Sequence, residues 1–153
     1  MNNNYNDKFL EVAFNEAKKS LDLDEIPVGA VIVKDGVIIS KGHNLKETNN
    51  TVLDHAELIA INSASKILNN WRLIDCDLYV TLEPCEMCAS AIKQARISNI
   101  YCALSNDDEK IHHNVLNILN NDKSNPKVSL FNDLNPSYSK DILNRFFVDK
   151  RDK

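Results

Sequence analysis

Two cysteines in the run Pro84-Cys85-Glu86-Met87-Cys88 are the first residues whose type and spacing could support chemistry. Residues three apart share one face of a helix, so both sulfur atoms could bind the same metal ion. The positive end of a helix also favours the thiolate, which is the form that a metal binds. Because two cysteines do not complete a zinc site, this interpretation requires further ligands. The alternative for the same spacing is a pair of small, buried apolar residues at the start of a helix.

The run His55-Ala56-Glu57 forms a second motif, at the expected start of the preceding helix. Asp54 with Glu57 three residues later also fits a capping box, in which Glu57 only holds the helix end. Both motifs, however, follow a loop or a strand end and open a helix, and adjacent parallel crossovers place such helix starts at one edge of a sheet. We therefore predict that His55, Cys85 and Cys88 converge on one zinc ion and leave its fourth position to water.

An open zinc site beside a carboxylate that is not a ligand has a definite chemical use. Zinc lowers the pKa of its bound water from about 15.7 toward roughly 7, which produces hydroxide at neutral pH. Glu57 lies two residues from the predicted ligand His55, and it could accept that proton and return it to a substrate. This chemistry suits hydrolytic attack on an electron-poor carbon that carries an amine leaving group.

The order of the expected elements predicts the fold that positions these motifs. Hydrophobic periodicity indicates a first helix, and Asp35-Gly36 between two β-branched runs predicts a hairpin. Proline is favoured at the first helical position, so Pro84 predicts the start of another helix. The alternation favours a mixed sheet with helices on both faces. The expected helices are at 5–20, 54–68, 84–95, 115–119 and 138–148, and the expected strands at 28–33, 37–39, 78–82, 100–104 and 127–131.

Composition excludes several classes of protein. A length of 153 residues, of which 43% are hydrophobic and 26% charged, fits one globular domain. The net charge of −4 argues against nucleic-acid binding through bulk positive charge, so such a partner would need a local patch. Three glycines are too few, and wrongly spaced, for a dinucleotide fingerprint or a phosphate loop. We expect a soluble, cytoplasmic protein, because the chain shows no leader pattern and no run of 18 apolar residues.

The two chemical motifs together match the signature of the zinc-dependent nucleobase deaminases. More narrowly, the chain resembles the bacterial tRNA-specific adenosine deaminases, a family in the zinc-dependent cytidine/deoxycytidylate deaminase superfamily. The resemblance is close over about residues 5–104 and loose over the remainder. The segments that carry it are EIPVGAVIV at 25–33, GHN at 42–44, HAE at 55–57, WRLIDCDLYVTLEPCEMCASAI at 71–92 and ARI at 95–97.

The resemblance implies a three-layer α/β/α, cytidine-deaminase-like fold with a mixed five-stranded sheet, in a single domain over residues 1–153. The core would lie at about 5–104 and a C-terminal helical tail at about 136–153. It also implies that His55, Cys85 and Cys88 hold one Zn²⁺ per subunit of a homodimer, and that Glu57 moves protons. The substrate would be the wobble adenosine of a tRNA anticodon stem-loop, converted to inosine. The implied substrate-binding residues are Val28, Ala30, Asn44, Ala56, Glu83 and Pro84.

The C-terminal segment also resembles the tail of the family. Cations beside aromatic rings suit a splayed single-stranded loop, whose phosphates pair with the cations while its bases stack on the rings. The alternative is a plain amphipathic helix with both phenylalanines in the core. The expected RNA contacts are Arg145, Phe146, Phe147, Lys150 and Arg151.

One stretch departs from the family pattern. After the strand at 100–104 the family usually has small residues that include glycine and end in serine, whereas residues 105–115 of this chain read SNDDEKIHHNV. In the family that region lies near substrate and subunit contacts. We expect His112 and His113 to be solvated loop histidines, with a regulatory or metal-binding pair as the alternative.

Two other functions fit parts of the sequence. A deaminase of free bases or nucleosides, such as guanine or cytosine, is favoured by the acidic net charge and the altered stretch, whereas Asn44 and the tail argue against it. A non-catalytic zinc module would instead add Cys76 or Cys102 to Cys85 and Cys88 in a closed structural site. That module would leave the motif at 55–57 without a role.

Overall fold

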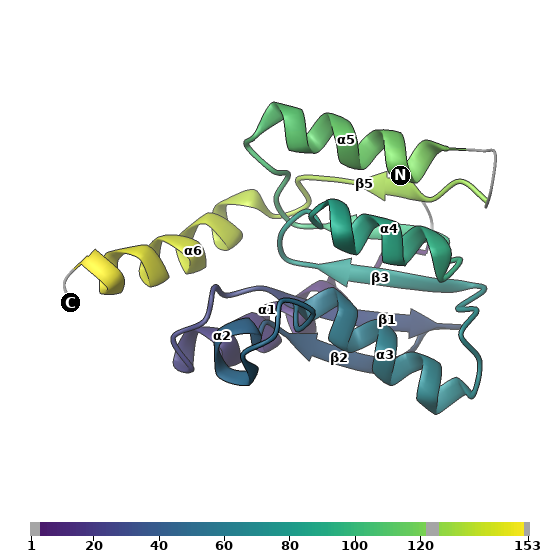
Figure 1. The fold of residues 1–153 in the computed structure, drawn as a ribbon, viewed down its shortest axis with the longest axis horizontal. Coiled ribbons are helices and arrows are strands. Elements are labelled where there is room, and N and C mark those ends of the chain that lie inside the picture. Colours follow the sequence, from purple (N-terminus) through teal and green to yellow (C-terminus); the bar gives the residue numbers. More distant parts are fainter. Residues whose placement is uncertain (1–3, 122–125, 152–153) are drawn as a thin grey trace.

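A five-stranded mixed sheet lies at the centre of the computed structural model, which describes residues 4–121 and 126–151, with only the backbone of the last two (Figure 1). Its strands are β1 (Gly29–Lys34), β2 (Val37–His43), β3 (Cys76–Val80), β4 (Asn99–Cys102) and β5 (Ser129–Phe131). They lie in the order β2-β1-β3-β4-β5. β1 is antiparallel to both of its neighbours, whereas β3, β4 and β5 are parallel, so the predicted mixed sheet is confirmed.

Helices cover both faces of this sheet. They are α1 (Asp7–Asp22), α2 (Lys46–Asn49), α3 (Ala56–Leu68), α4 (Glu86–Gln94), α5 (Glu109–Asn120) and α6 (Pro136–Arg151). α3, α4 and α5 pack on one face, whereas α1 and the first part of α6 pack on the other. The three-layer α/β/α architecture is therefore confirmed, and Figure 1 shows the rest of α6 extending away from the sheet. In the described part of the chain, the helices are too short or too polar to cross a membrane.

The hairpin between β1 and β2 forms as predicted. Asp35 and Gly36 have φ values of 52° and 74°. Positive φ at both central residues is the type I′ geometry, which matches the twist of the flanking strands. β1 is buried along nearly all of its length, because β2 and β3 flank it and helices cover both faces. A rigid central strand therefore supports the helices that begin at the sheet edge.

Gly42 allows α3 to lie directly against β2. A Cβ atom at this position would be 2.4 Å from the Ala56 carbonyl oxygen and 2.9 Å from the Ala60 nitrogen. Both are backbone atoms, so no side-chain rotation could relieve the contact. The small, fully buried side chains of Ala56, Ala60 and Ala64 extend the close approach along α3. This packing determines where the N-terminus of α3 lies.

The start of α4 differs from the prediction. Cys85 is the N-cap, with an extended backbone, and the helix begins at Glu86. Pro84 therefore lies before the helix, and its predicted place at the first helical position is wrong. The difference matters because a side chain at the N-cap stands at the very end of the helix, where the unpaired backbone N–H groups point.

The predicted loop around His112 and His113 is also wrong, since both residues lie on α5. The helix begins earlier than expected because the side chain of Asp108 caps it. This carboxylate accepts hydrogen bonds from the backbone nitrogens of Lys110 and Ile111 at 3.0 and 3.2 Å. His112 is half-buried as a result, whereas His113 is exposed.

Candidate active site

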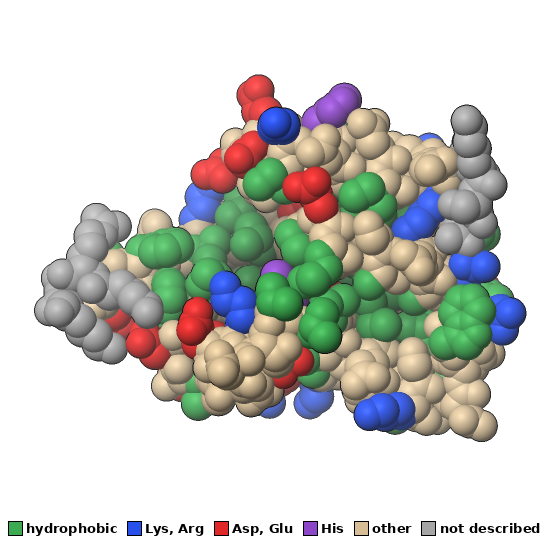
Figure 2. Space-filling model, viewed as in Figure 1, with side chains coloured by type: hydrophobic (Ala, Val, Ile, Leu, Met, Phe, Trp, Pro, Cys, Tyr) green, Lys and Arg blue, Asp and Glu red, His purple; other side chains and the backbone are tan. Residues whose placement is uncertain are grey.

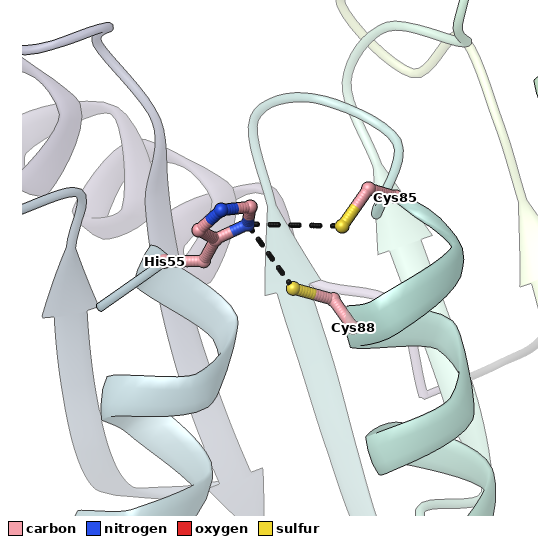
Figure 3. Close-up of side chains that lie close together, drawn as sticks. All are labelled: His55, Cys85 and Cys88. Carbon is pink, nitrogen blue, oxygen red and sulfur yellow. Dashed lines mark hydrogen bonds between the residues drawn. The ribbon is translucent and has the colours of Figure 1, made fainter. Parts of the chain in front are cut away.

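His55, Cys85 and Cys88 come together at the N-termini of two adjacent helices (Figure 3). His55 is the N-cap of α3, and Cys85 is the N-cap of α4. The Nδ1 atom of His55 lies 3.7 Å from the Sγ atom of Cys85 and 3.4 Å from that of Cys88. The structure thus brings together the three side chains that the sequence predicts to converge.

These separations fit a tetrahedral zinc ion. Zinc binds sulfur at about 2.3 Å and nitrogen at about 2.0–2.1 Å, which places two tetrahedral ligand atoms roughly 3.5–3.8 Å apart. The three ligand atoms in the structure all lie within 4.8 Å of one another. Three protein ligands leave one position open, as in catalytic zinc sites.

A closed site that includes Cys76 or Cys102 does not form. Within the described residues, the ligand cluster contains neither of these thiols. The Cys102 thiol donates a hydrogen bond to the Leu104 carbonyl oxygen at 3.2 Å, and complete burial raises its pKa well above the usual value. Cys102 therefore stays protonated, and the structural zinc module predicted as an alternative is wrong in its ligands.

The helix start also prepares Cys85 for metal binding. The pKa of the Cys85 thiol is lowered to about 5, chiefly by a hydrogen bond from the Cys88 thiol. The backbone N–H groups of Cys88 and Met87 lower it further, and so does the nearby charge of His55. Cys85 is thus a thiolate near neutral pH, which is the form that binds zinc.

Glu57 is the second residue of α3, directly after Ala56, and it lies beside the metal-binding cluster. Its side chain is only 4% exposed, and burial raises the pKa of its carboxyl group to about 7. The carboxyl group also forms a hydrogen bond with the Cys88 thiol. A carboxyl group with such a pKa can take up and release a proton at neutral pH.

The capping-box interpretation of Glu57 is wrong. The N-cap of α3 is His55, one residue later than that interpretation requires, and no side chain caps this end. Asp54 instead accepts a hydrogen bond from the side-chain amide of Asn49 at 2.7 Å. Glu57 therefore points into the protein and does not hold the helix end.

A cavity of about 210 Å³ opens beside the ligand cluster. Pockets for drug-sized ligands have volumes of roughly 300–1,000 Å³, so this one suits a single heterocyclic base. Figure 2 shows the face covered by α3, α4 and α5, on which hydrophobic side chains surround a hollow. The residues that line the cavity are Ile26, Val28, Asn44, Lys46, His55, Ala56, Glu57, Leu82, Glu83, Cys85 and Asn106.

Four of the expected substrate-binding residues line this cavity, namely Val28, Asn44, Ala56 and Glu83. Ala30 and Pro84 are buried and are not among the lining residues. Sequence reasoning missed Ile26, Lys46, Leu82 and Asn106 as lining residues. Ile26 and Leu82 belong to the runs that carry the family resemblance, which was the available signal, whereas Lys46 and Asn106 had none.

Asn44 is held on several sides. Its backbone nitrogen donates to the Val28 carbonyl oxygen at 3.1 Å, and its own carbonyl oxygen accepts from the Ser20 hydroxyl at 2.8 Å. Its side-chain amide donates to the Ile26 carbonyl oxygen at 3.2 Å. Asn44 is thus a fixed polar group in a mostly apolar cavity.

The expected RNA contacts on α6 differ in their exposure to solvent. Phe146 is buried at 7% exposure, whereas Phe147 is 47% exposed and Arg145 is also exposed. The alternative that both rings lie in the core therefore holds for Phe146 alone. The side chains of Lys150 and Arg151 lie outside the described residues.

Residues 3–104 match the cytidine and deoxycytidylate deaminase zinc-binding region. The tRNA-specific adenosine deaminase of Streptococcus pyogenes serotype M18 (strain MGAS8232) is 41% identical over 145 residues, which are 95% of this chain and 91% of that protein.

Two solved structures also resemble the chain. One, from a study of A-to-I editing by tRNA:A34 deaminases at the wobble position of transfer RNA, has a TM-score of 0.81 and 34% identity, and the match covers 90% of this chain and 99% of that one. The other is a guanine deaminase from Bacillus subtilis with a TM-score of 0.63 and 41% identity, and the match covers 72% of this chain and 69% of that one.

Proposed function

The chain belongs to the cytidine and deoxycytidylate deaminase family, and from this premise we propose that it converts adenosine to inosine at the wobble position of a tRNA anticodon loop. The observation that carries the proposal is the place of Glu57. It is a buried carboxyl group outside the metal-binding cluster, and it lines a cavity that suits one base together with His55 and Cys85 of that cluster. The similarity to tRNA-specific adenosine deaminases over most of the chain favours adenosine in tRNA as the substrate.

The chemistry needs water activation and the movement of two protons. A zinc ion held by His55, Cys85 and Cys88 would lower the pKa of a water molecule toward neutral and so supply the nucleophile. Glu57 would take one proton from the attacking water and give it to the ring nitrogen beside the amine-bearing carbon. After attack on that carbon, Glu57 would move the second water proton to the amine, which leaves as ammonia. Adenosine and water thus give inosine and ammonia, and Glu57 returns to its initial state.

The cavity walls would select and orient the base. Val28, Ala56 and Leu82 offer apolar surface to the ring, and the amide of Asn44 offers hydrogen bonds to its edge. A single-stranded loop suits such a pocket, because turning out an unpaired base costs less than opening a duplex. At the cavity, Lys46 would pair with a phosphate group, and the exposed Phe147 on α6 would stack on a neighbouring base.

A second candidate function is the deamination of a free base. The guanine deaminase that resembles this chain at 41% identity favours it, and so does the net charge of −4, which repels a polyanion. The cavity itself would accept either substrate class. The two functions differ in whether contacts outside the cavity contribute to binding.

We further propose a cytoplasmic homodimer with one Zn²⁺ and one catalytic domain per chain. Exposed apolar side chains at the two ends of α3 favour such an interface, because a partner would remove them from water. Val52, Leu53 and Ile67 are each about 60% exposed. Sedimentation equilibrium should give twice the chain mass of 17.3 kDa, and a monomer at micromolar concentration would contradict the dimer.

Inosine formation on a panel of substrates tests the proposed function. The panel contains an anticodon stem-loop with a wobble adenosine, the same stem-loop with its adenosine paired in the stem, free adenosine and free guanine. We expect a deaminated product, detected by mass spectrometry, from the first substrate alone. Deamination of guanine alone would overturn the tRNA assignment and keep the deaminase chemistry. No product from any substrate, with zinc bound, would overturn both.

A further inference from the structure

The side chain of Glu83 is buried beside the cavity, and the proposed reaction does not use it. Its Oε1 atom accepts two hydrogen bonds of 2.7 Å, one from Nδ2 of Asn132 and one from Nδ1 of His112. Its Oε2 atom has no hydrogen-bond partner within the described residues. Because a buried carboxylate is costly without partners, these two donors determine where the Glu83 side chain lies.

The partners of Glu83 come from three separate segments. Glu83 lies in the loop between β3 and α4, two residues before Cys85, whereas His112 lies on α5 and Asn132 follows β5. The backbone nitrogen of Glu83 also donates to the Leu104 carbonyl oxygen at 2.9 Å. The carboxylate thus joins the loop that precedes α4 to the two elements that follow β4.

A second contact holds the same region together. The backbone nitrogen and the hydroxyl of Ser105 donate to Oδ1 of Asp133 at 2.9 and 3.0 Å. Ser105 directly precedes Asn106, which forms part of the cavity wall. Movement of Glu83 would therefore displace a wall to which both Glu83 and Asn106 contribute.

We propose that His112 is a positioning residue for the part of the cavity wall that Glu83 and Asn106 form. His112 does not line the cavity, so it acts through the Glu83 carboxylate. A wall displaced by a fraction of an ångström misaligns the base with Glu57, which lowers kcat more than it weakens RNA binding. The kinetic part of this inference rests on the proposed function, whereas the structural part does not.

Substitutions at this position separate the hydrogen bond from the bulk of the side chain. His112→Asn places an amide N–H where Nδ1 lies, so it should keep the bond to Glu83. His112→Leu and His112→Gln should both lose the bond, the first by removing the donor and the second by moving it away. His113→Leu is the matched control, because His113 is the exposed neighbour on the same helix.

Hydrogen exchange measured by mass spectrometry tests the structural part. Loss of one partner of a buried polar group raises the equilibrium constant for local opening by roughly tenfold or more. The amides of Glu83 and Ser105 should therefore exchange about ten times faster in His112→Leu and His112→Gln than in the wild type. His112→Asn and His113→Leu should exchange like the wild type. Exchange at the wild-type rate in both His112→Leu and His112→Gln would overturn the inference. Exchange that is equally fast in His112→Asn would also overturn it. Should His112→Leu fail to fold, His112→Gln decides alone.

Steady-state kinetics on the anticodon stem-loop tests the part that concerns the cavity. In the loss variants kcat should fall at least about fivefold while KM stays within about twofold, and the zinc content should stay at one per chain. A raised KM with unchanged kcat would overturn the role in positioning. If the wild type does not deaminate the stem-loop, the proposed function fails, and the exchange comparison still decides whether His112 holds the wall.

Discussion

Replacing Gly42 by alanine tests whether the close packing of α3 on β2 places the metal ligands. The added Cβ atom would lie 2.4 Å from the Ala56 carbonyl oxygen, whereas ordinary contacts begin near 3.4 Å. The N-terminus of α3 must therefore move about 1 Å away from β2. Overpacking of this kind lowers the free energy of unfolding by about 1–3 kcal/mol. Each kcal/mol lowers the Tm of a chain of this size by about 2–4 °C, so we expect a loss of roughly 2–12 °C.

The same movement of α3 away from β2 should displace His55, which directly precedes Ala56. We expect the affinity for zinc to fall at least about tenfold, as it does when the groups that orient metal ligands are disturbed. Gly36→Ala is the control, because it places alanine at a φ of 74° with nothing within 4 Å of the new Cβ. That change should cost roughly 1–2 kcal/mol through backbone strain and leave the zinc affinity unchanged. Thermal unfolding and zinc competition with a chromophoric chelator measure both effects. Equal zinc affinities in the two variants would refute the reasoning.

Three further predictions concern the metal, the tail and the pH dependence of stability. Cys88→Ser should abolish stoichiometric zinc binding in metal analysis, whereas Cys76→Ser should keep one zinc per chain, and equal loss in both would contradict the ligand assignment. Phe147→Ala should weaken stem-loop binding several-fold in a gel-shift assay at unchanged Tm, whereas Phe146→Ala should lower the Tm by roughly 6 °C or more, since its ring is buried. Reversed effects would contradict the placement of the two rings. Asp77→Asn should raise the Tm at pH 7, because burial raises the pKa of Asp77 and ionisation then costs folding free energy. That gain should disappear as the pH falls below the unfolded-state pKa of about 3.9, and a gain that persists there would contradict the burial argument.

The metal ligands could be predicted from the sequence because local spacing and one topological rule determine them. The spacing of Cys85 and Cys88 places both sulfurs on one helical face. The rule that successive helices begin at the same sheet edge then brings His55 to them. Neither step depends on a side-chain contact between distant segments.

The remaining cavity wall could not be predicted in this way. Lys46 lies on the short helix α2, whose position depends on a distant residue, the buried Glu25. The Glu25 carboxylate accepts hydrogen bonds from the backbone nitrogens of Glu47 and Thr48. Likewise, the partner of His112 lies 29 residues earlier in the chain, so no local pattern indicates the contact.

The two phenylalanines of α6 show a different limit of prediction from sequence. Adjacent helical residues point about 100° apart, so a neighbouring pair cannot share one environment on a helix that is covered on one side only. Phe146 is buried, whereas Phe147 is exposed to solvent. The sequence alone does not show which of the two is turned inward, because the rotation of the helix depends on the residues that it packs against.

Metal content and inosine yield measured on one preparation of Glu57→Gln test the central claim most directly. Glutamine keeps the size of the side chain and removes its capacity to transfer protons. Glu11→Gln, an exposed position on α1, is the matched control. We predict one zinc per chain in both variants, with inosine formation lowered about 10²–10⁴-fold in Glu57→Gln and unchanged in Glu11→Gln. Full activity in zinc-loaded Glu57→Gln would contradict the role of this residue in proton transfer.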